Sequence, residues 1–220
     1  MYLSRLILNP RSRQVRNELA DPYELHRTIS RAFPEANYKD NEASGILFRV
    51  DVHPRTQIPT LLVQSREKPN WDFLSAEKKD YLLGENDLPL DVENPSFKEM
   101  NLQIRDGQFL SFRLRANPTK REKASAKRIG LIREEEQQKW LQRKLEAAGA
   151  ALVSVNIVNE QFTRGKLFTE REYTKRMNFL SVQFDGILQI KDSAKLLDGI
   201  SSGFGSAKGL GFGLLSLAHA

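Results

Sequence analysis

The pattern of hydrophobic and polar positions switches along the chain between the two-residue period of strands and the 3.6-residue period of helices. Short apolar or alternating runs bounded by Pro, Gly, Asn or Asp predict strands, and apolar side chains at i, i+3, i+4 and i+7 predict amphipathic helices. The predicted strands cover residues 2–8, 46–51, 59–65, 102–104, 110–115, 152–158, 178–184, 187–191 and 212–217, and predicted helices begin at Asp21, Trp71, Arg133 and Ser193.

The order of these elements is β-α-β-β-(α)-β, and it occurs twice along the chain. It predicts an α+β protein of two tandem ferredoxin-like (βαββαβ) domains, residues 1–106 and 107–220. No sequence repeat links the halves, so the element order alone supports a duplication. Asp106-Gly107 and Asp185-Gly186 each predict a tight hairpin turn. Residues 9–16, with three arginines, are interpreted as a basic connector.

The clearest helix start lies at Asp21, which is followed by Pro22 at the first helical position. Glu24, three residues after Asp21, predicts a capping box. Positions 25, 29, 32 and 33 carry the apolar side that should face a core: Leu25, Ile29, Ala32 and Phe33. His26 lies at the border of that side, about 60° around the helix from Tyr23, so the two side chains are expected to face one point beside the helix N-terminus.

Composition limits the class of partner. The net charge of +6 favours a polyanion, and nucleic acid is favoured over a membrane. No apolar run approaches 18 residues and no signal peptide is recognisable, so we expect a cytoplasmic protein without membrane contact. Cysteine is absent and the three histidines are far apart in sequence, so we expect no cofactor and favour metal-free chemistry over a carboxylate Mg²⁺ site.

Basic residues gather in three places. Residues 117–128 predict a mobile basic loop, residues 162–176 predict a basic hairpin that also carries aromatic residues, and two arginines share the open face of the strand at 110–115. We hypothesise that these elements bind a nucleic acid, the alternatives being a solvated linker and an exposed polar hairpin. The predicted nucleic-acid-binding residues are Arg113, Arg115, Lys120, Arg121, Lys127, Arg128, Arg164, Arg171, Lys175 and Arg176.

A glycine-rich tail, residues 203–213, has five glycines and one lysine before an apolar strand. Glycine lets a backbone approach a ligand closely and turn its N–H groups toward an anion such as a phosphodiester. The spacing is not that of a nucleotide-binding loop, and a flexible turn before a closing strand is the alternative. The predicted phosphodiester contacts in this tail are Gly205, Ser206, Lys208 and Gly209.

Five stretches spread over nearly the whole chain carry a family resemblance: residues 1–4 (MYLS), 21–26 (DPYELH), 112–118 (FRLRANP), 140–145 (WLQRKL) and 208–217 (KGLGFGLLSL). With these motifs the chain resembles the CasE/Cse family, the endoribonucleases that process CRISPR RNA in the type I-E Cascade complex. The resemblance implies a tandem ferredoxin-like fold. It also implies metal-independent cutting of precursor CRISPR RNA at the 3′ base of each repeat stem-loop. The resemblance implies that the enzyme then stays on its product as a subunit of Cascade, alongside the other subunits. With it, we expect the three basic elements to embrace the RNA stem. We expect the protein itself to be a monomer.

The family's catalytic histidine and tyrosine stand three residues apart on the first helix, and His26 and Tyr23 match them. A cation of the basic hairpin also acts in parts of the family, and Lys166 and Arg164 are the candidates here. Such cutting needs only an activated 2′-OH, proton transfer and positive charge, and it leaves 2′,3′-cyclic phosphate and 5′-OH ends. The acid and base roles of Tyr23 and His26 stay open. The competing hypotheses are a non-catalytic RNA-binding scaffold and, less favoured, a nucleotide-binding enzyme that uses the tail.

Overall fold

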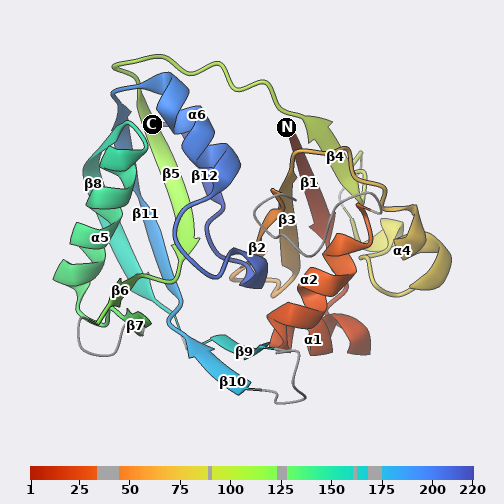
Figure 1. Ribbon diagram of the computed structural model, residues 1–220. Helices are drawn as coiled ribbons and strands as arrows, with labels where there is room; N and C mark the ends of the chain where they lie inside the picture. The colour runs from red at the N-terminus through yellow and green to blue at the C-terminus, as the bar shows by residue number, and fades with distance from the viewer. Residues whose placement is uncertain (34–44, 89–90, 123–127, 161–162, 168–174) are drawn as a thin grey trace. The chain divides into compact units, whose positions relative to one another are not determined.

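The computed structural model of the protein describes residues 1–33, 45–88, 91–122, 128–160, 163–167 and 175–220, with only the backbone described between 163 and 178. The described residues divide into two compact units, Met1–Asn101 with Gly209–Gly211, and Leu102–Lys208 with Phe212–Ala220. Each unit contains one four-stranded antiparallel sheet with helices (Figure 1). The predicted α+β class with two ferredoxin-like folds is confirmed. No helix in the described part of the chain is long and apolar enough to cross a membrane.

The sheet of the N-terminal unit has the strand order β2-β3-β1-β4, and all neighbouring strands are antiparallel. This is the order expected when two β-α-β crossovers interleave. The helices bury one side of the sheet in a core that includes Leu6, Ile29, Phe48 and Leu61. The elements are β1 (Tyr2–Ile7), α1 (Arg13–Ala20), α2 (Pro22–Ser30), β2 (Leu47–Val52), β3 (Pro59–Ser65), α4 (Asp72–Glu77), η1 (Glu85–Asp87) and β4 (Ser96–Glu99).

Two predictions for residues 1–106 were wrong. Residues 13–20, interpreted as part of a connector, form helix α1, whose N-cap Ser12 accepts a hydrogen bond from Val15 N–H. The predicted strand at 102–104 is absent from the described residues, and the fourth strand is β4, paired with β1. Both elements escape a periodicity search because each has few apolar side chains. β4 is a short edge strand with three exposed positions.

The C-terminal unit repeats the topology with the strand order β12-β5-β11-β8. Trp140 of α5 stacks on Phe184 of β11 at a centroid distance of 6.1 Å, and Ala148 at the end of α5 lies beside Gly199 of α6. The elements are β5 (Phe109–Ala116), β6 (Thr119–Arg121), β7 (Arg128–Gly130), α5 (Glu134–Ala147), β8 (Ala150–Asn159), β9 (Thr163–Leu167), β10 (Lys175–Phe179), β11 (Val182–Ile190), α6 (Ser193–Ser202), η2 (Lys208–Leu210) and β12 (Leu215–His219).

The predicted hairpin turn at Asp185-Gly186 was also wrong. β11 is one continuous strand that passes through both residues and pairs with β5 and β8. Glycine is needed at 186 for another reason, because a Cβ atom there would lie 2.1 Å from the carbonyl oxygen of Ser154 on β8. A glycine inside a strand often marks such a close approach of a second backbone.

Two short hairpins extend from this unit. β6 and β7 pair across residues 119–130, where we predicted a mobile basic loop; the ends of that segment are therefore ordered strands. β9 and β10 pair from Thr163 with Phe179 to Leu167 with Lys175, which confirms the predicted hairpin. We call residues 163–179 the basic arm.

Candidate active site

The helix that carries Tyr23 and His26 starts at a shared residue. Asp21 ends α1 with its backbone N–H, which donates to the carbonyls of Asn17 and Glu18, and it begins α2 with its side chain, which accepts from Tyr23 N–H at 3.2 Å. The predicted capping box is wrong because the Asp21 N–H that Glu24 would have bonded is already used by α1. The Glu24 carboxylate instead forms a 3.0 Å ion pair with Arg27 on the surface.

His26 packs against an aromatic ring. Its imidazole stacks on the buried ring of Phe48 in β2, with centroids 6.0 Å apart and planes 20° from parallel. His26 is half-buried and its Nδ1 atom is shielded from solvent, so its exposed surface comes from other atoms of the residue. Tyr23, three residues earlier on α2, is also half-buried. The helix therefore carries one imidazole and one phenol near its N-terminal end. That the two side chains face one point stays a prediction.

One piece of the glycine-rich tail belongs to the same unit as His26. Gly209–Gly211 groups with residues 1–101, and Gly211, at a φ of 85°, lies against Phe48. A Cβ atom at Gly211 would be 3.1 Å from Phe48 Cε2, so a larger residue would press on the ring that supports His26. The sequence contained no signal for this role of Phe48, because the contacts join residues that are far apart in the chain.

The rest of the tail forms a closed loop. Phe204 N–H donates to Gly213 O at 2.9 Å, and Gly213, at a φ of 91°, would place a Cβ only 2.8 Å from Phe204 O. Ser206 Oγ is shielded from solvent and has no hydrogen-bond partner among the described residues. Lys208 begins the short helix η2. The close approach to Phe204 and the positive φ explain why position 213 is a glycine. Contacts of RNA with Gly205, Ser206, Lys208 and Gly209 stay a prediction.

A buried polar cluster links α2 to α1 and to residues 78 and 81. The Glu18 carboxylate of α1 accepts from Tyr81 Oη at 2.5 Å, from Thr28 Oγ1 of α2 at 2.9 Å and from Gln14 Nε2 at 2.7 Å. Lys78 Nζ lies 3.4 Å from the same carboxylate, with both side chains less than 10% exposed. Burial lowers the pKa of Lys78 despite the neighbouring Glu18. A charged cluster of this kind strongly favours one position of α2, because any shift would leave a buried charge unpaired.

Replacing Tyr81 with phenylalanine tests that cluster. The loss of a hydrogen bond to a buried carboxylate is expected to lower the free energy of unfolding by about 1.5–3 kcal/mol at neutral pH. Burial, and then the Glu18 charge and hydrogen bond, raise the pKa of Tyr81 far above its usual value. Above pH 10 the unfolded chain loses the tyrosine proton while the folded protein keeps it, so wild-type stability falls by about 1.4 kcal/mol per pH unit relative to Y81F. Urea unfolding of both proteins between pH 7 and pH 11 measures this; a difference that does not shrink above pH 10 contradicts it.

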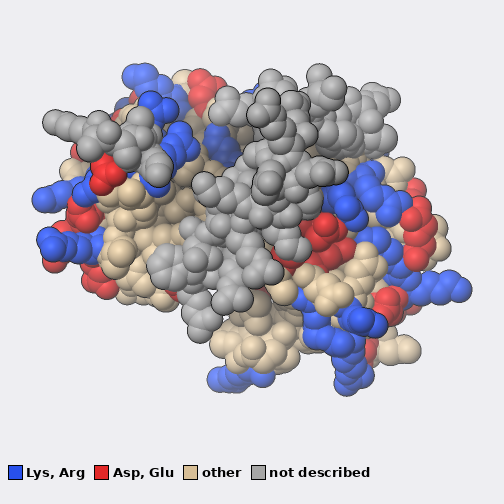
Figure 2. Space-filling model, turned by 60° about the horizontal axis from the view of Figure 1, so that its bottom comes forward, with Lys and Arg blue, Asp and Glu red and all other residues tan. Residues whose placement is uncertain are grey.

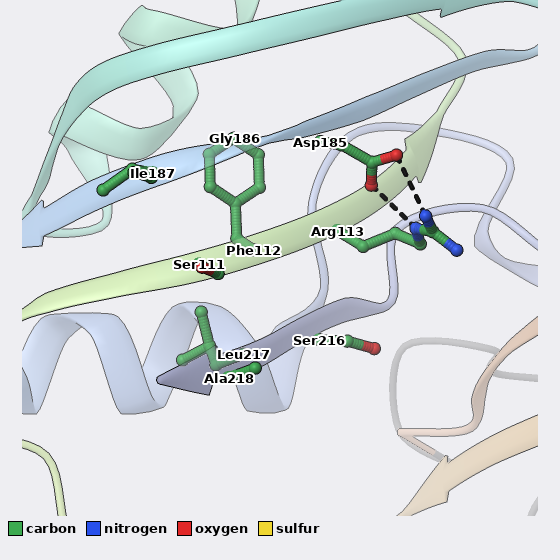
Figure 3. A pocket seen from close by; sticks show the side chains of 9 residues that line it. All are labelled: Ser111, Phe112, Arg113, Asp185, Gly186, Ile187, Ser216, Leu217 and Ala218. Atoms are coloured by element: carbon green, nitrogen blue, oxygen red, sulfur yellow. Dashed lines mark hydrogen bonds and ion pairs between the residues drawn. The ribbon is translucent and has the colours of Figure 1, made fainter. Parts of the chain in front are cut away.

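The two arginines of β5 both have acidic partners. Arg113 forms two hydrogen bonds, of 2.7 and 3.0 Å, with the Asp185 carboxylate of β11 in a shallow hollow of the sheet (Figure 3). Arg115 bonds Glu160 at 2.7 Å and Ser181 at 2.9 Å. They share the open sheet face as predicted. Because each guanidinium has a carboxylate counterpart, binding to RNA phosphate would compete with an existing pair.

The β6–β7 hairpin presents exposed cations. Arg121 and Arg128 are cross-strand partners, and Lys120 pairs with Glu136 of α5 at 2.7 Å. That hydrogen bond to Lys120 lowers the pKa of the exposed Glu136 carboxyl. On the face in Figure 2, the described Lys and Arg side chains are interspersed with Asp and Glu. The described charges on that face therefore form no patch of a single sign. Lys127, also predicted to bind RNA, lies outside the described residues.

The β9–β10 register gives the positions of the predicted RNA-binding residues in the basic arm. β9 carries Arg164 and Lys166, which pair with Asn178 and Arg176 on β10. Cross-strand partners share a face of a two-stranded ribbon, so positions 164, 166 and 176 fall on one face and Lys175 on the other. Arg171 lies outside the described residues. In the described part of the chain no group of three or more His, Asp or Glu side chains could hold a metal ion.

The comparisons with known proteins cover the whole chain. Residues 1–219 match the family described as CRISPR associated protein. The chain is 35% identical to the CRISPR-associated endoribonuclease Cse3 of Thermus thermophilus, over 99% of this chain and all of that protein. It is 31% identical to the Cascade subunit CasE of Escherichia coli, over 99% of both. A solved structure of Cse3 bound to 19 nt RNA superposes with a TM-score of 0.83 at 35% identity and covers 99% of this chain and 100% of that one.

The fold and the matches define the class of protein: the chain belongs to the CRISPR-associated protein family. Within that family it is a member of the CasE/Cse type I-E group, as the motifs indicated.

Proposed function

We propose that the protein is a metal-independent endoribonuclease that cuts precursor CRISPR RNA at the 3′ base of the repeat stem-loop. The observation that carries the proposal is the placement of His26 near the start of α2, stacked on Phe48, with Gly209–Gly211 in the same unit. The similarity to an endoribonuclease and to its RNA-bound structure supports it.

The chemistry requires no group that the chain lacks. The ribose 2′-OH attacks the adjacent phosphorus, the bond from phosphorus to the 5′ oxygen breaks, and the products are a 2′,3′-cyclic phosphate and a 5′-OH. One proton leaves the 2′-OH and one reaches the departing oxygen, and imidazole suits either transfer near neutral pH. Because Nδ1 of His26 is shielded, Nε2 is the atom we assign to proton transfer. Tyr23 orients the 2′-OH, and Lys166 is our candidate for stabilising the charge on the phosphorane.

In this proposal one domain supplies the catalytic residues and the other supplies most of the RNA-binding residues. Residues 1–106 supply the catalytic helix, and residues 107–220 supply the basic loop, the basic arm and most of the glycine-rich tail, which bind the RNA stem. The product then stays bound, and the protein acts as a subunit of Cascade alongside the other subunits, as the name of its Escherichia coli relative indicates. The substrate is a cellular transcript, so we place the protein in the cytoplasm.

The decisive experiment uses radiolabelled repeat RNA in a buffer with EDTA. We expect one cut at the 3′ base of the stem-loop, a 2′,3′-cyclic phosphate on the upstream product and a 5′-OH on the downstream product. A single 2′-deoxy nucleotide just upstream of the cut should lower the rate constant at least about 10³-fold, because the nucleophile is gone. Intact RNA in every lane would favour a non-catalytic scaffold. Full cutting of the deoxy substrate would exclude 2′-OH attack.

A further inference from the structure

Arg115 forms hydrogen bonds at the base of the basic arm. Its Nε donates to Glu160 at 2.7 Å and to Ser181 Oγ at 2.9 Å, and Ser181 Oγ also donates to the Glu160 carboxylate. Glu160 directly follows β8, and Ser181 directly precedes β11. The N–H of Glu160 donates to the carbonyl of Ser181 at 2.9 Å, which adds one rung to the β8–β11 ladder. We call Glu160 and Ser181 the arm root.

The strand register changes at this root. Asn159 pairs with Val182 in the sheet, and Thr163 pairs with Phe179 in the arm. Three residues therefore separate the two ladders on the first strand, and two separate them on the second. An unequal count of this kind bends and twists a β-ribbon. The direction in which the arm leaves the sheet thus depends on what fixes the root, and Arg115 adds a side-chain contact to each of the two root residues. Ser181 is fully buried, and Glu160 is half-buried.

The same arginine holds the glycine-rich tail. Its carbonyl accepts from Gly213 N–H at 2.8 Å, and its guanidinium lies over the ring of Phe212 at 5.7 Å. Arg115 therefore contacts both the arm root and the end of the tail, the two elements for which we propose RNA contacts. Arg113, two residues earlier on the same sheet face, bonds Asp185 of β11 within the sheet. Its side chain is 44% exposed, against 23% for Arg115.

We propose that Arg115 is a positioning residue, which sets the direction of the basic arm through Glu160 and Ser181 and does not itself bind a phosphate. The proposal rests on the proposed nuclease function for its effect on cutting, but its structural part does not. A phosphate contact and a positioning contact make opposite predictions for Glu160. Removing the Glu160 charge frees Arg115 for RNA in the first case, and it releases the arm in the second.

The experiment compares wild type with R115A, E160Q, the R115A/E160Q double variant and S181A, each checked for folding by its melting curve. Hydrogen exchange of the RNA-free proteins should show faster exchange in residues 163–167 and 175–179 for R115A, E160Q and S181A. R113A is the matched control and should leave arm exchange unchanged. With repeat RNA, R115A and E160Q should each lower the single-turnover cleavage rate constant about tenfold or more, and the double variant should be no slower than the worse single variant.

Salt dependence separates the two roles of Arg115. Loss of one phosphate contact lowers the slope of log affinity against log salt by about one. For a positioning residue we expect R115A and E160Q to keep the wild-type slope. The proposal is overturned if arm exchange is the same in all variants, or if E160Q cuts as fast as wild type while R115A loses a unit of slope. If wild type cuts no RNA but the exchange pattern holds, the nuclease function fails and the positioning of the arm by Arg115 stands.

Discussion

Replacing His26 with alanine is expected to lower the single-turnover rate of RNA cutting by at least about 10³-fold, with repeat RNA affinity changed less than about threefold. General acid–base catalysis by one side chain contributes about 10²–10⁴-fold, and no second described histidine lies on α2 to replace it. Affinity should survive because we assign RNA binding to phosphate contacts in other elements. The measurement is a filter-binding isotherm and a cleavage time course on the same preparation.

His53 supplies the matched control for this prediction. It lies in the exposed turn between β2 and β3, where its Nδ1 accepts from Thr56 N–H at 3.2 Å, and H53A should cut RNA at the wild-type rate. Removing His26 also deletes the ring stacked on Phe48, so the melting temperature of H26A should be recorded beside its rate. Cutting by H26A within tenfold of wild type would mean that another group transfers the proton.

Local sequence signals predicted the elements that depend on local chemistry. Asp21 and Pro22 mark the start of α2, and a strict alternation marks β5, because a cap and a half-buried strand leave their signatures within a few residues. α5 ends before Gly149, which adopts a φ of 77°. The hairpin of the basic arm was predicted from basic residues interleaved with aromatic ones, and β9 pairs with β10 there.

The failures came where long-range contacts decide the structure. Asp185-Gly186 has the composition of a hairpin turn, yet Gly186 is required by a neighbouring strand that the local sequence does not reveal. The capping box at Asp21 failed because α1, the helix that uses its N–H, had not been recognised.

In the candidate site, too, some residues could be predicted from the sequence and others could not. Tyr23 and His26 follow from helical spacing and the family motif, whereas the ring beneath His26 and the cluster below α2 require the tertiary fold. Phe48 comes from a strand more than twenty residues away, and Tyr81 lies 63 residues from Glu18. Arg115 shows the converse: its position on the open face was predicted, but its carboxylate partner lies 45 residues further along the chain and changes the role we assign to it.

Gly186 is the position in the C-terminal unit where one added methyl group should cost most. Its Cβ would meet the Ser154 carbonyl oxygen at 2.1 Å and the Phe112 ring at 3.0 Å. Real Cβ atoms essentially never approach another heavy atom below 3.0 Å. The obstacle is backbone, not the end of a flexible side chain, so β8 and β11 would have to separate. That movement would break hydrogen bonds between β11 and the edge strand β8, the two strands that lead into the basic arm.

We therefore expect G186A to lower the free energy of unfolding by at least about 3 kcal/mol, at the upper end of the cost of overpacking a core. Urea unfolding followed by circular dichroism measures it. G130A is the matched control: Gly130 is also a strand residue of this unit, its φ is not positive, and an added Cβ would meet only Leu180, at an ordinary 3.4 Å. That variant should unfold within about 0.5–1 kcal/mol of wild type. A G186A protein as stable as G130A would mean that β11 bends at Asp185-Gly186 after all, as the sequence alone suggested.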